Sequence, residues 1–361
     1  MSALPFAGER ALAQTWLYTG TDYGTGTNWS TGVTPGAGGT ATFNQGIPNQ
    51  PVVNGGFTIG TVNMTAGSLT LNAGTLTVQS AFNLTDASIL GSGTLSLGAG
   101  SLLTAGGNSA VVIAPRISGS GAALITGSNV TFTGANAFTG TTTINPGGQL
   151  SLGNGGTTGQ LGTGAVTNNG SLSFNRSNAL TVGNAISGSG TVTKLGVGTT
   201  SLTGANTYIG TTTILAGTLS VGAGGTTGTL GTGAVINNAT LQVDRSDATV
   251  TLSNNISGTG ALIKTNAGTS TTLVLTGNNT YSGTTTITEG VLQVGAGGTT
   301  GTLGTGLTIN NGSLVFNRSD ALTVSSALIG GGSVTQAGTG ARHEMFHSNE
   351  RWAVTFAGRS R

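Results

Sequence analysis

The sequence has no cysteine and very little charge, and both shortages narrow the range of functions. Charged residues make up 6% of the chain, against about 25% in typical globular proteins. The formal net charge is +2 with no basic stripe, so we expect no nucleic-acid partner. No apolar run approaches the ~20 residues that cross a bilayer, and we expect no direct membrane insertion by this chain. The absence of cysteine is compatible with export without disulfides and with a cytosolic location.

The sequence is rich in glycine and in short polar residues. The chain of 361 residues contains 67 glycines, and 36% of its residues are hydrophobic. Disordered chains usually combine high net charge with few apolar residues, which is not the case here. Leu, Val, Ile and Ala alternate with Thr, Ser and Asn, a pattern typical of pleated strands separated by tight turns.

One stretch occurs three times and organises the chain. Each copy contains a polar turn, an aromatic residue, a threonine-rich strand, a second turn and a short alternating strand. The three copies are Phe132–Gly153, Leu202–Gly222 and Leu275–Gly295. Their aromatic residues, Phe138, Tyr208 and Tyr281, are 70 and 73 residues apart. We divide each repeat into about three coils of ~23 residues, which lies within the range of solenoid proteins.

The repeat predicts an all-β fold. No segment shows a helical period over the length of a helix, which excludes the helical solenoids. Propeller blades have repeats of about 40–50 residues with their own signatures. Strands this short cannot bury a face alone, but coils stacked at ~4.8 Å share one core. We therefore predict a right-handed parallel β-helix (β-solenoid) with an N-terminal cap.

The composition divides the chain into four segments. Residues 1–14 end in an A-x-A pattern at Ala11–Ala13, which indicates either a signal-peptide remnant or chance in an alanine-rich start. Residues 15–60 hold tryptophans and prolines suited to an N-terminal cap. Residues 61–341 form the β-helix array, with long repeats near 134–203, 204–276 and 277–341. Residues 342–361 break the pattern, which we interpret as a frame slip or truncation, with a polar end-cap as the rival interpretation.

The three repeated stretches resemble the autotransporter-associated β-strand repeat of bacterial surface proteins. The resemblance lies in Leu202-Thr-Gly-Ala-Asn-Thr-Tyr-Ile-Gly-Thr-Thr-Thr-Ile, in the following Ala216-Gly-Thr-Leu-Ser-Val-Gly and in the two sister copies. The segment that begins at Asn28 looks like the opening of passenger domains in the same group. The match covers about residues 16–340.

The resemblance implies a passenger domain of type V secretion. Such a passenger leaves a Gram-negative bacterium through the periplasm and stays at the cell surface or is secreted. These proteins normally continue into a C-terminal translocator barrel, whereas the pattern of this chain breaks at Ala341. The resemblance implies an adhesive, structural β-helical rod that binds surface glycans or proteins, or associates with itself.

The sequence offers few groups for catalysis. Sugar-cleaving β-helix enzymes gather carboxylates on one face, but the carboxylates here are sparse. Asp244 and Asp247 flank Arg245, which we interpret as a local ion pair. We expect Arg176, Arg245 and Arg318, which share one repeat position, to form a ladder of surface charges and not a site.

The two histidines of the chain match one metal motif. His343 and His347 enclose Glu344 in an H-E-x-x-H pattern, which on a helix is typical of zinc peptidases. The pattern lies in the atypical tail, without a domain around it. We therefore assign no catalytic, cofactor-binding or metal-binding residue and expect no cofactor. A non-enzymatic passenger is the favoured function, and a carbohydrate-active enzyme on a β-helix scaffold is the alternative.

Overall fold

The computed structural model describes residues 13–17, 22–44, 51–127, 129–265, 271–340 and 354–356. The chain divides into two compact units. Unit 1 comprises Met1–Asn154 and Thr158–Ser171, and unit 2 comprises Gly155–Thr157 and Leu172–Arg361. Most of the predicted leader remnant 1–14 and most of the predicted tail 342–361 lie outside the described residues.

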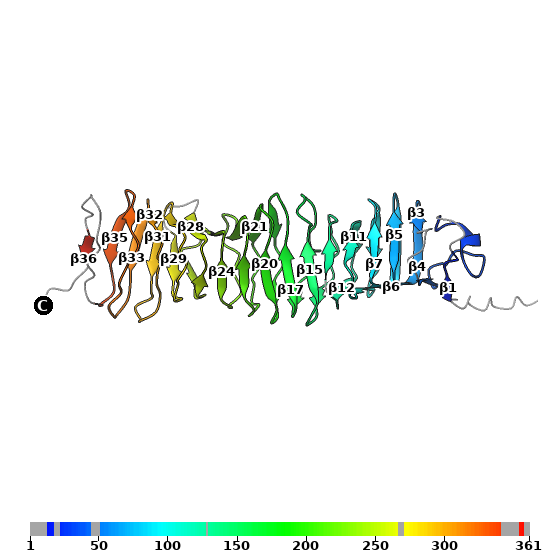
Figure 1. Cartoon of the computed structure of the whole chain (residues 1–361), viewed down its shortest axis with the longest axis horizontal. Coiled ribbons are helices and arrows are strands. Elements are labelled where there is room, and N and C mark those ends of the chain that lie inside the picture. Colours follow the sequence, from blue (N-terminus) through cyan, green and yellow to red (C-terminus); the bar gives the residue numbers. More distant parts are fainter. Residues whose placement is uncertain are drawn as a thin grey trace, which may run out of the picture. The chain divides into compact units, whose positions relative to one another are not determined.

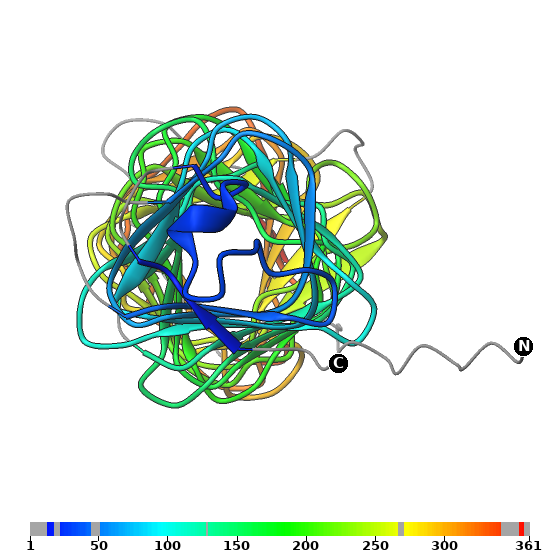
Figure 2. The same ribbon diagram turned by 90° about the vertical axis from the view of Figure 1, so that its right-hand side faces the viewer.

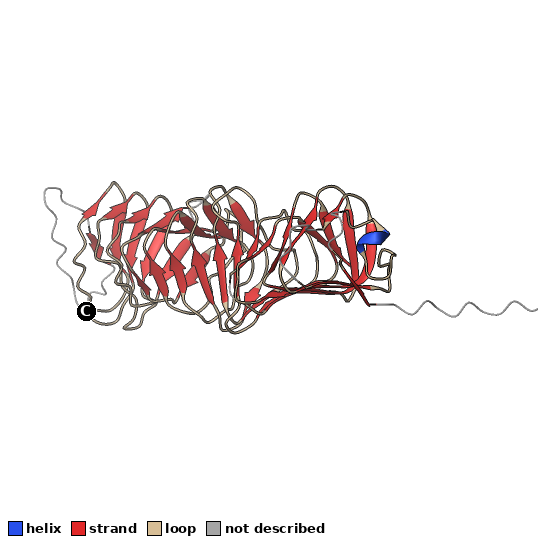
Figure 3. Cartoon of the chain, turned by 45° about the vertical axis from the view of Figure 1, so that its right-hand side comes forward, coloured by secondary structure: helices blue, strands red, loops and turns tan. Residues whose placement is uncertain are grey.

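Unit 1 is built from strands, with one short 3-10 helix, η1 (Gly26–Asn28), among its described residues (Figure 3). Its strands are β1 (Ala13–Thr15), β2 (Thr40–Phe43), β3 (Val52–Val53), β4 (Phe57–Met64), β5 (Gly67–Leu71), β6 (Thr75–Thr85), β7 (Ala87–Leu90), β8 (Thr94–Leu97), β9 (Leu102–Gly106), β10 (Val111–Ile113), β11 (Arg116–Gly119), β12 (Ala122–Ile125), β13 (Val130–Phe132), β14 (Thr142–Ile144), β15 (Gln149–Leu152) and β16 (Val166–Asn168).

Unit 2 contains strands only among its described elements, and β17 begins at its border with unit 1. The strands are β17 (Ser171–Phe174), β18 (Leu180–Val182), β19 (Ile186–Ser187), β20 (Thr191–Lys194), β21 (Thr199–Leu202), β22 (Thr212–Ile214), β23 (Thr218–Val221), β24 (Val235–Asn237), β25 (Thr240–Asp244), β26 (Thr249–Leu252), β27 (Ile256–Ser257), β28 (Ala261–Thr265), β29 (Thr272–Leu275), β30 (Thr285–Ile287), β31 (Val291–Val294), β32 (Thr308–Asn310), β33 (Ser313–Phe316), β34 (Leu328–Ile329), β35 (Ser333–Gln336) and β36 (Val354–Phe356).

The predicted parallel β-solenoid is confirmed. In unit 2 the chain passes from β24 to β25 and β26, each in a different sheet, and returns with β27 to the sheet of β24. There β24 and β27 pair in parallel, with Val235 opposite Ile256. Each coil therefore lays its strands on those of the preceding coil, as the stacked arrows in Figure 1 show. The predicted all-β fold class holds in both units.

The interior is filled by the alternate residues of each strand. In unit 1, β4, β6, β9 and β12 align Val62, Phe82, Leu103 and Ala123 in one row, and all four side chains are buried. Burial of such a side chain contributes about 1.5–3 kcal/mol. Because the row runs through successive coils, each side chain is covered by its neighbours above and below, and no single coil could bury it.

Aromatic side chains cover the N-terminal end of unit 1. The indole of Trp29 packs edge-on against both Trp16 and Tyr23, with ring centroids 5.1 Å apart in each pair. Trp29 Nε1 also donates a hydrogen bond to the Tyr23 carbonyl at 3.0 Å. Phe43 and Phe57 join the cluster. In Figure 2 this segment, in dark blue, crosses the end of the unit 1 coils.

Equivalent strands of the second and third repeats lie in different sheets of unit 2. Strand β22 and its counterpart β30 both read Thr-Thr-Ile, yet β22 pairs with β24 while β30 pairs with β28 and β32. One coil takes 21 to 23 residues, the spacings of Thr212, Val235 and Ile256 along the sheet of β24. A repeat of 73 residues is therefore three coils and one further side, and the prediction of about three whole coils misses this extra side.

Buried asparagines join three successive coils in unit 2. Asn206 Oδ1 accepts a hydrogen bond from the amide of Ile186 at 3.0 Å, and its Nδ2 donates to the carbonyl of Thr229 at 2.7 Å. Asn279 repeats both bonds, to the Ile256 amide and the Thr302 carbonyl. The asparagine side chain thus satisfies backbone groups of the coil before it and the coil after it, where no strand ladder is available.

The aromatic residue of each repeat explains the glycine of the Leu-Gly-Thr-Gly motif. A Cβ at Gly231 would lie 2.5 Å from Cδ2 of Tyr208, and a Cβ at Gly304 would lie 2.4 Å from Cε2 of Tyr281. The tyrosine hydroxyl of one coil bonds a threonine in the same repeat, as Tyr208 does with Thr212 at 2.8 Å. Only glycine leaves room for the ring at this point of the next coil.

We predict that Asn206→Ala lowers the free energy of unfolding by about 2–4 kcal/mol. The substitution leaves the Ile186 amide and the Thr229 carbonyl without their hydrogen-bond partner, at a cost of about 1–3 kcal/mol each. Urea denaturation followed by circular dichroism measures the change. The matched control is Thr207→Ala, because alanine already stands at the equivalent position of the first repeat, Ala137. Loss of less than 0.5 kcal/mol in Asn206→Ala, on the order of an ordinary surface change, would contradict the bridging role.

We predict that Tyr23→Phe leaves the free energy of unfolding unchanged or raises it by up to about 1 kcal/mol. The Tyr23 hydroxyl is buried and has no hydrogen-bond partner among the described residues, so its removal relieves a desolvation cost. Tyr208→Phe serves as the comparison and is expected to lose about 1 kcal/mol, because its hydroxyl has a partner. A clear loss of stability in Tyr23→Phe refutes this account of the aromatic cluster.

Candidate functional site

Four of the six described carboxylates accept hydrogen bonds from groups close to them in the fold. Asp86 Oδ1 accepts hydrogen bonds from the backbone amides of Asn108 at 2.6 Å and Ser109 at 2.5 Å. The bond from Ser109 is the main reason why the pKa of Asp86 lies below its usual value. Asp247 and Asp320 each pair with an arginine. Across the described ranges no three residues among His, Asp and Glu gather into a metal-binding group.

The arginines of the second and third repeats close loops and do not line a surface. Arg318 pairs with Asp320 at 2.7 Å and donates from Nη1 to the carbonyl of Gly301 at 2.7 Å. Arg245 makes the same pair with Asp247 and donates to the carbonyl of Gly228. The predicted ion pair of Arg245 with a neighbouring aspartate is confirmed for Asp247.

The predicted ladder of surface charges is wrong for these two arginines. Their side chains are only 11% and 9% exposed, for Arg245 and Arg318 respectively. Arg245 also follows β25, whereas Arg318 follows β33, and these two strands belong to different sheets. The extra side in each repeat carries the equivalent residue to the next sheet. Arg176 has a neutral partner instead, donating from Nε to Asn178 Oδ1 at 3.0 Å.

Two buried lysines are the charged groups that sequence reasoning missed. Lys194 and Lys264 occupy equivalent inward positions, and they are 1% and 3% exposed. Lys194 Nζ donates to the carbonyls of Gly196 and Ala216. Because Ala216 belongs to the next coil, this ammonium joins two coils at their corner. The strict alternation of buried and outward residues in Thr191–Lys194 was the signal that could have placed it inside.

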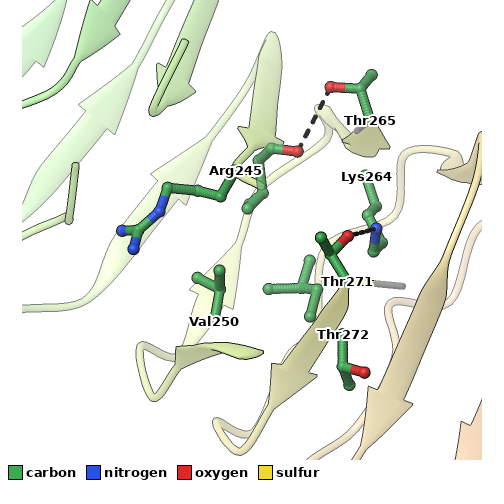
Figure 4. A pocket seen from close by; sticks show the side chains of 8 residues that line it. Arg245, Val250, Lys264, Thr265, Thr271 and Thr272 are labelled. Carbon is green, nitrogen blue, oxygen red and sulfur yellow. Dashed lines mark hydrogen bonds between the residues drawn. The ribbon is translucent and has the colours of Figure 1, made fainter. Parts of the chain in front are cut away.

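Lys264 repeats this arrangement in the third repeat. Its Nζ donates to Thr271 Oγ1 at 3.0 Å and to the carbonyl of Glu289 at 3.1 Å. Figure 4 shows the bond to Thr271 and the guanidinium of Arg245 directed away from the amine. Burial lowers the pKa of Lys264, and the negative charge of Glu289 partly opposes that effect.

The cavity beside Lys264 is small. It has a volume of about 10 Å³, and its lining includes Val250, Thr265 and Thr272. A cavity needs about 10–15 Å³ to hold one water molecule, so a sugar ring does not fit. The carboxylates of Asp86, Asp247 and Asp320 are held by local bonds. Arg245 and Lys264, the two charged residues that line this cavity, are bonded to groups of the fold.

Two sequence-based points are still open, namely the H-E-x-x-H pattern of the tail and membrane insertion. His343 and His347, the predicted zinc-peptidase pattern, lie outside the described residues. Among the described residues, no helix combines the length and the apolar character that a membrane crossing requires.

We predict that the stability of the protein rises between about pH 8 and pH 10.5 through Lys194. Burial lowers the pKa of Lys194 to about 8 from 10.5, so in this window the unfolded chain holds a proton that the folded chain has released. Stability increases with pH wherever the unfolded state binds more protons. Urea midpoints at pH 7 and pH 10, for wild type and Lys194→Met, measure the effect. An equal change of midpoint in both proteins contradicts a buried, depressed amine.

Comparison with known proteins matches three segments of the chain to one family model. The model is the passenger-associated-transport repeat, and it matches residues 119–152, 192–221 and 262–294. The matched segments overlap the three copies of the repeated stretch, and each contains the aromatic residue of its copy, namely Phe138, Tyr208 or Tyr281. No solved structure matches the chain.

A curated relative shares one part of the array. The adhesin BmaC autotransporter of Brucella suis biovar 1 (strain 1330) is 49% identical over 61 residues, which is 17% of this chain and 2% of that protein. The chain thus matches a small fraction of a much longer protein. The chain contains three passenger-associated-transport repeats built into a parallel β-solenoid, and over these segments it is similar to autotransporter passengers.

Proposed function

We propose that the chain is a non-enzymatic, structural and adhesive passenger segment. It acts at the surface of a Gram-negative bacterium or is secreted from it. The observation that carries the proposal is the set of three passenger repeats, in a fold whose outward positions are mostly polar and rarely charged. The relative named as an adhesin supports the adhesive part over the 61 residues that it shares.

The neutral surface suits many weak contacts. Among the described residues, the charged side chains in the fully exposed class are Asp22, Arg116 and Glu289. Outward positions of the unit 2 strands carry hydroxyl groups instead, such as Thr213 and Thr286. Hydroxyl groups bind uncharged glycans and protein backbones through hydrogen bonds that are weak singly. Many copies in one array raise the overall avidity well above that of each contact.

Adhesion is tested with beads coated with the full chain on surfaces of immobilised neutral and acidic glycans and of matrix protein. We predict that these beads are retained at least tenfold better than albumin-coated beads on one or more neutral surfaces. Retention changes little between 0.05 and 0.5 M NaCl, because there are few exposed charges for salt to screen. Retention equal to that of albumin beads on every surface rejects the adhesive role.

Two substitutions locate the contact on the outward threonines. We expect Thr213→Glu with Thr286→Glu to lower bead retention at least threefold, because a carboxylate must be desolvated in each contact. Thr213→Ser with Thr286→Ser is the matched control, since it keeps the hydroxyl groups. Release of new reducing ends from the glycan surface contradicts the non-enzymatic part of the proposal and leaves the adhesive part to the retention measurement.

A further inference from the structure

An asparagine–glycine pair lies at an exposed turn of unit 1. Asn54 and Gly55 stand between β3 and β4, and Asn54 is exposed to solvent. The sequence has three other pairs of this kind, which begin at Asn154, Asn169 and Asn311. An asparagine that precedes glycine can react with its own backbone, because glycine has no Cβ that hinders the approach of its nitrogen to the asparagine side chain. The structure distinguishes the first pair from the other three.

The fold requires glycine at the other three pairs and not at Gly55. Gly155 has a φ of +94°, and a Cβ at Gly170 or Gly312 would lie 2.2 or 2.5 Å from a backbone oxygen of the preceding coil. The φ of Gly55 lies outside the left-handed region, and a Cβ there would meet Cε2 of Phe57 at 3.7 Å, an ordinary contact. Neither backbone conformation nor lack of space therefore accounts for the glycine at position 55.

The backbone amide of Gly55 has no hydrogen-bond partner among the described residues. At the other pairs the amide is engaged. Gly155 donates to the carbonyl of Asn175 at 2.8 Å, and Gly170 and Gly312 each donate at 3.2 Å to the side-chain oxygen of the asparagine two residues before. A bonded amide must give up its partner before its nitrogen attacks the neighbouring side chain, which adds to the barrier. The folded chain therefore favours reaction at Asn54.

Asn72 in the next coil polarises the side chain of Asn54. Val53 pairs with Leu71, which places Asn54 beside Asn72, and Nδ2 of Asn72 donates to Oδ1 of Asn54 at 3.3 Å. Attack on Cγ of Asn54 moves negative charge onto Oδ1, and a donor already directed at that oxygen stabilises the charge. Asn72 is itself fixed, because its amide donates to the carbonyl of Val53 at 3.1 Å.

We propose that Asn54–Gly55 is a site of spontaneous covalent modification, with water as the co-reactant. The Gly55 nitrogen attacks Cγ of Asn54 and closes a succinimide ring. The bond between Cγ and Nδ2 breaks, and Nδ2 leaves as ammonia with the proton of the Gly55 amide. Water then opens the ring at either carbonyl and gives aspartate or isoaspartate. This inference is independent of the adhesive function.

Either product adds charge to a chain that has little. A carboxylate replaces the neutral amide of residue 54, and the formal net charge of the chain falls from +2 to +1. The new carboxylate arises close to Asp22, which is opposite Val52, two residues before Asn54. Isoaspartate also lengthens the turn before β4 by one main-chain carbon, because the peptide bond then runs through Cγ.

Peptide mapping of the full chain tests the proposal after incubation at about pH 7.4 and 37 °C in water enriched in oxygen-18. Each asparagine that has reacted carries one heavy oxygen in place of its amide nitrogen. Digestion with pepsin at low pH, where the ring closes slowly, preserves the result. In the folded chain we expect conversion at Asn54 at least fivefold faster than at Asn154, Asn169 and Asn311. In concentrated guanidinium chloride we expect the four rates to agree within about twofold, because all four amides are then free.

Gly55→Ala is the test variant. It makes the pair equal to its counterpart in the next coil, Asn72–Ala73, and the added Cβ has room in the turn. We expect conversion of Asn54 to slow at least tenfold with an unchanged urea midpoint. The matched control is Gly56→Ala, because a Cβ at Gly56 meets nothing within 4 Å and the reacting pair is kept. We expect this control to react at the rate of the wild type.

Two results overturn the proposal directly. One is conversion at Asn54 that is no faster than at the other three pairs of the folded chain. The other is an equal rate in Gly55→Ala and the wild type. An advantage of Asn54 that persists unchanged in guanidinium chloride also contradicts it, because the neighbouring sequence and not the fold would then set the rate.

Discussion

The structure depends on one constraint, namely that every coil needs the next coil in register to cover its interior side chains. Strands of two to five residues dominate unit 2, and such strands are too short to bury a face alone. In register, rows such as Leu202, Val221 and Val243 run through successive coils and are buried. The backbone bonds between coils and the shared apolar interior therefore form together.

The polar groups inside the coils serve the same stacking. Asn206 and Asn279 connect the coils before and after them, and Lys194 and Lys264 bond carbonyls at the corners. The arginine–aspartate pairs close loops within the array. These uses bury Lys194, Lys264 and Arg318 and leave most of the other described charged residues of unit 2 only partly exposed. The surface that remains consists mainly of Thr, Ser, Asn and Gly, with some exposed aliphatic side chains such as Val197 and Ile209, and it suits weak and repeated contacts.

The sequence predicted the fold class because alternation and repetition are local signals. The period of two in Thr218–Val221 and the recurrence of Tyr208 at Tyr281 suffice for a parallel solenoid. The advance of each repeat by one side was not predictable, since a fraction of a coil depends on turn lengths that the spacing alone does not fix. The arginine ladder was wrong for that reason. The burial of Lys194 was missed because lysine is almost never fully buried, and this outweighed the alternation of its strand.

The in-register stack of unit 2 is tested most directly by a distance between two labelled positions. Ser201, Ser220, Gln242, Ile263 and Thr286 are aligned on five neighbouring strands. Spin labels on Ser201→Cys and Thr286→Cys, in a chain otherwise free of cysteine, are measured by double electron–electron resonance. The two labelled positions are four strand spacings apart, which predicts one narrow distribution of label-to-label distances centred at about 19 Å. A broad distribution, or one centred beyond about 30 Å, which is more than six strand spacings, contradicts the stack.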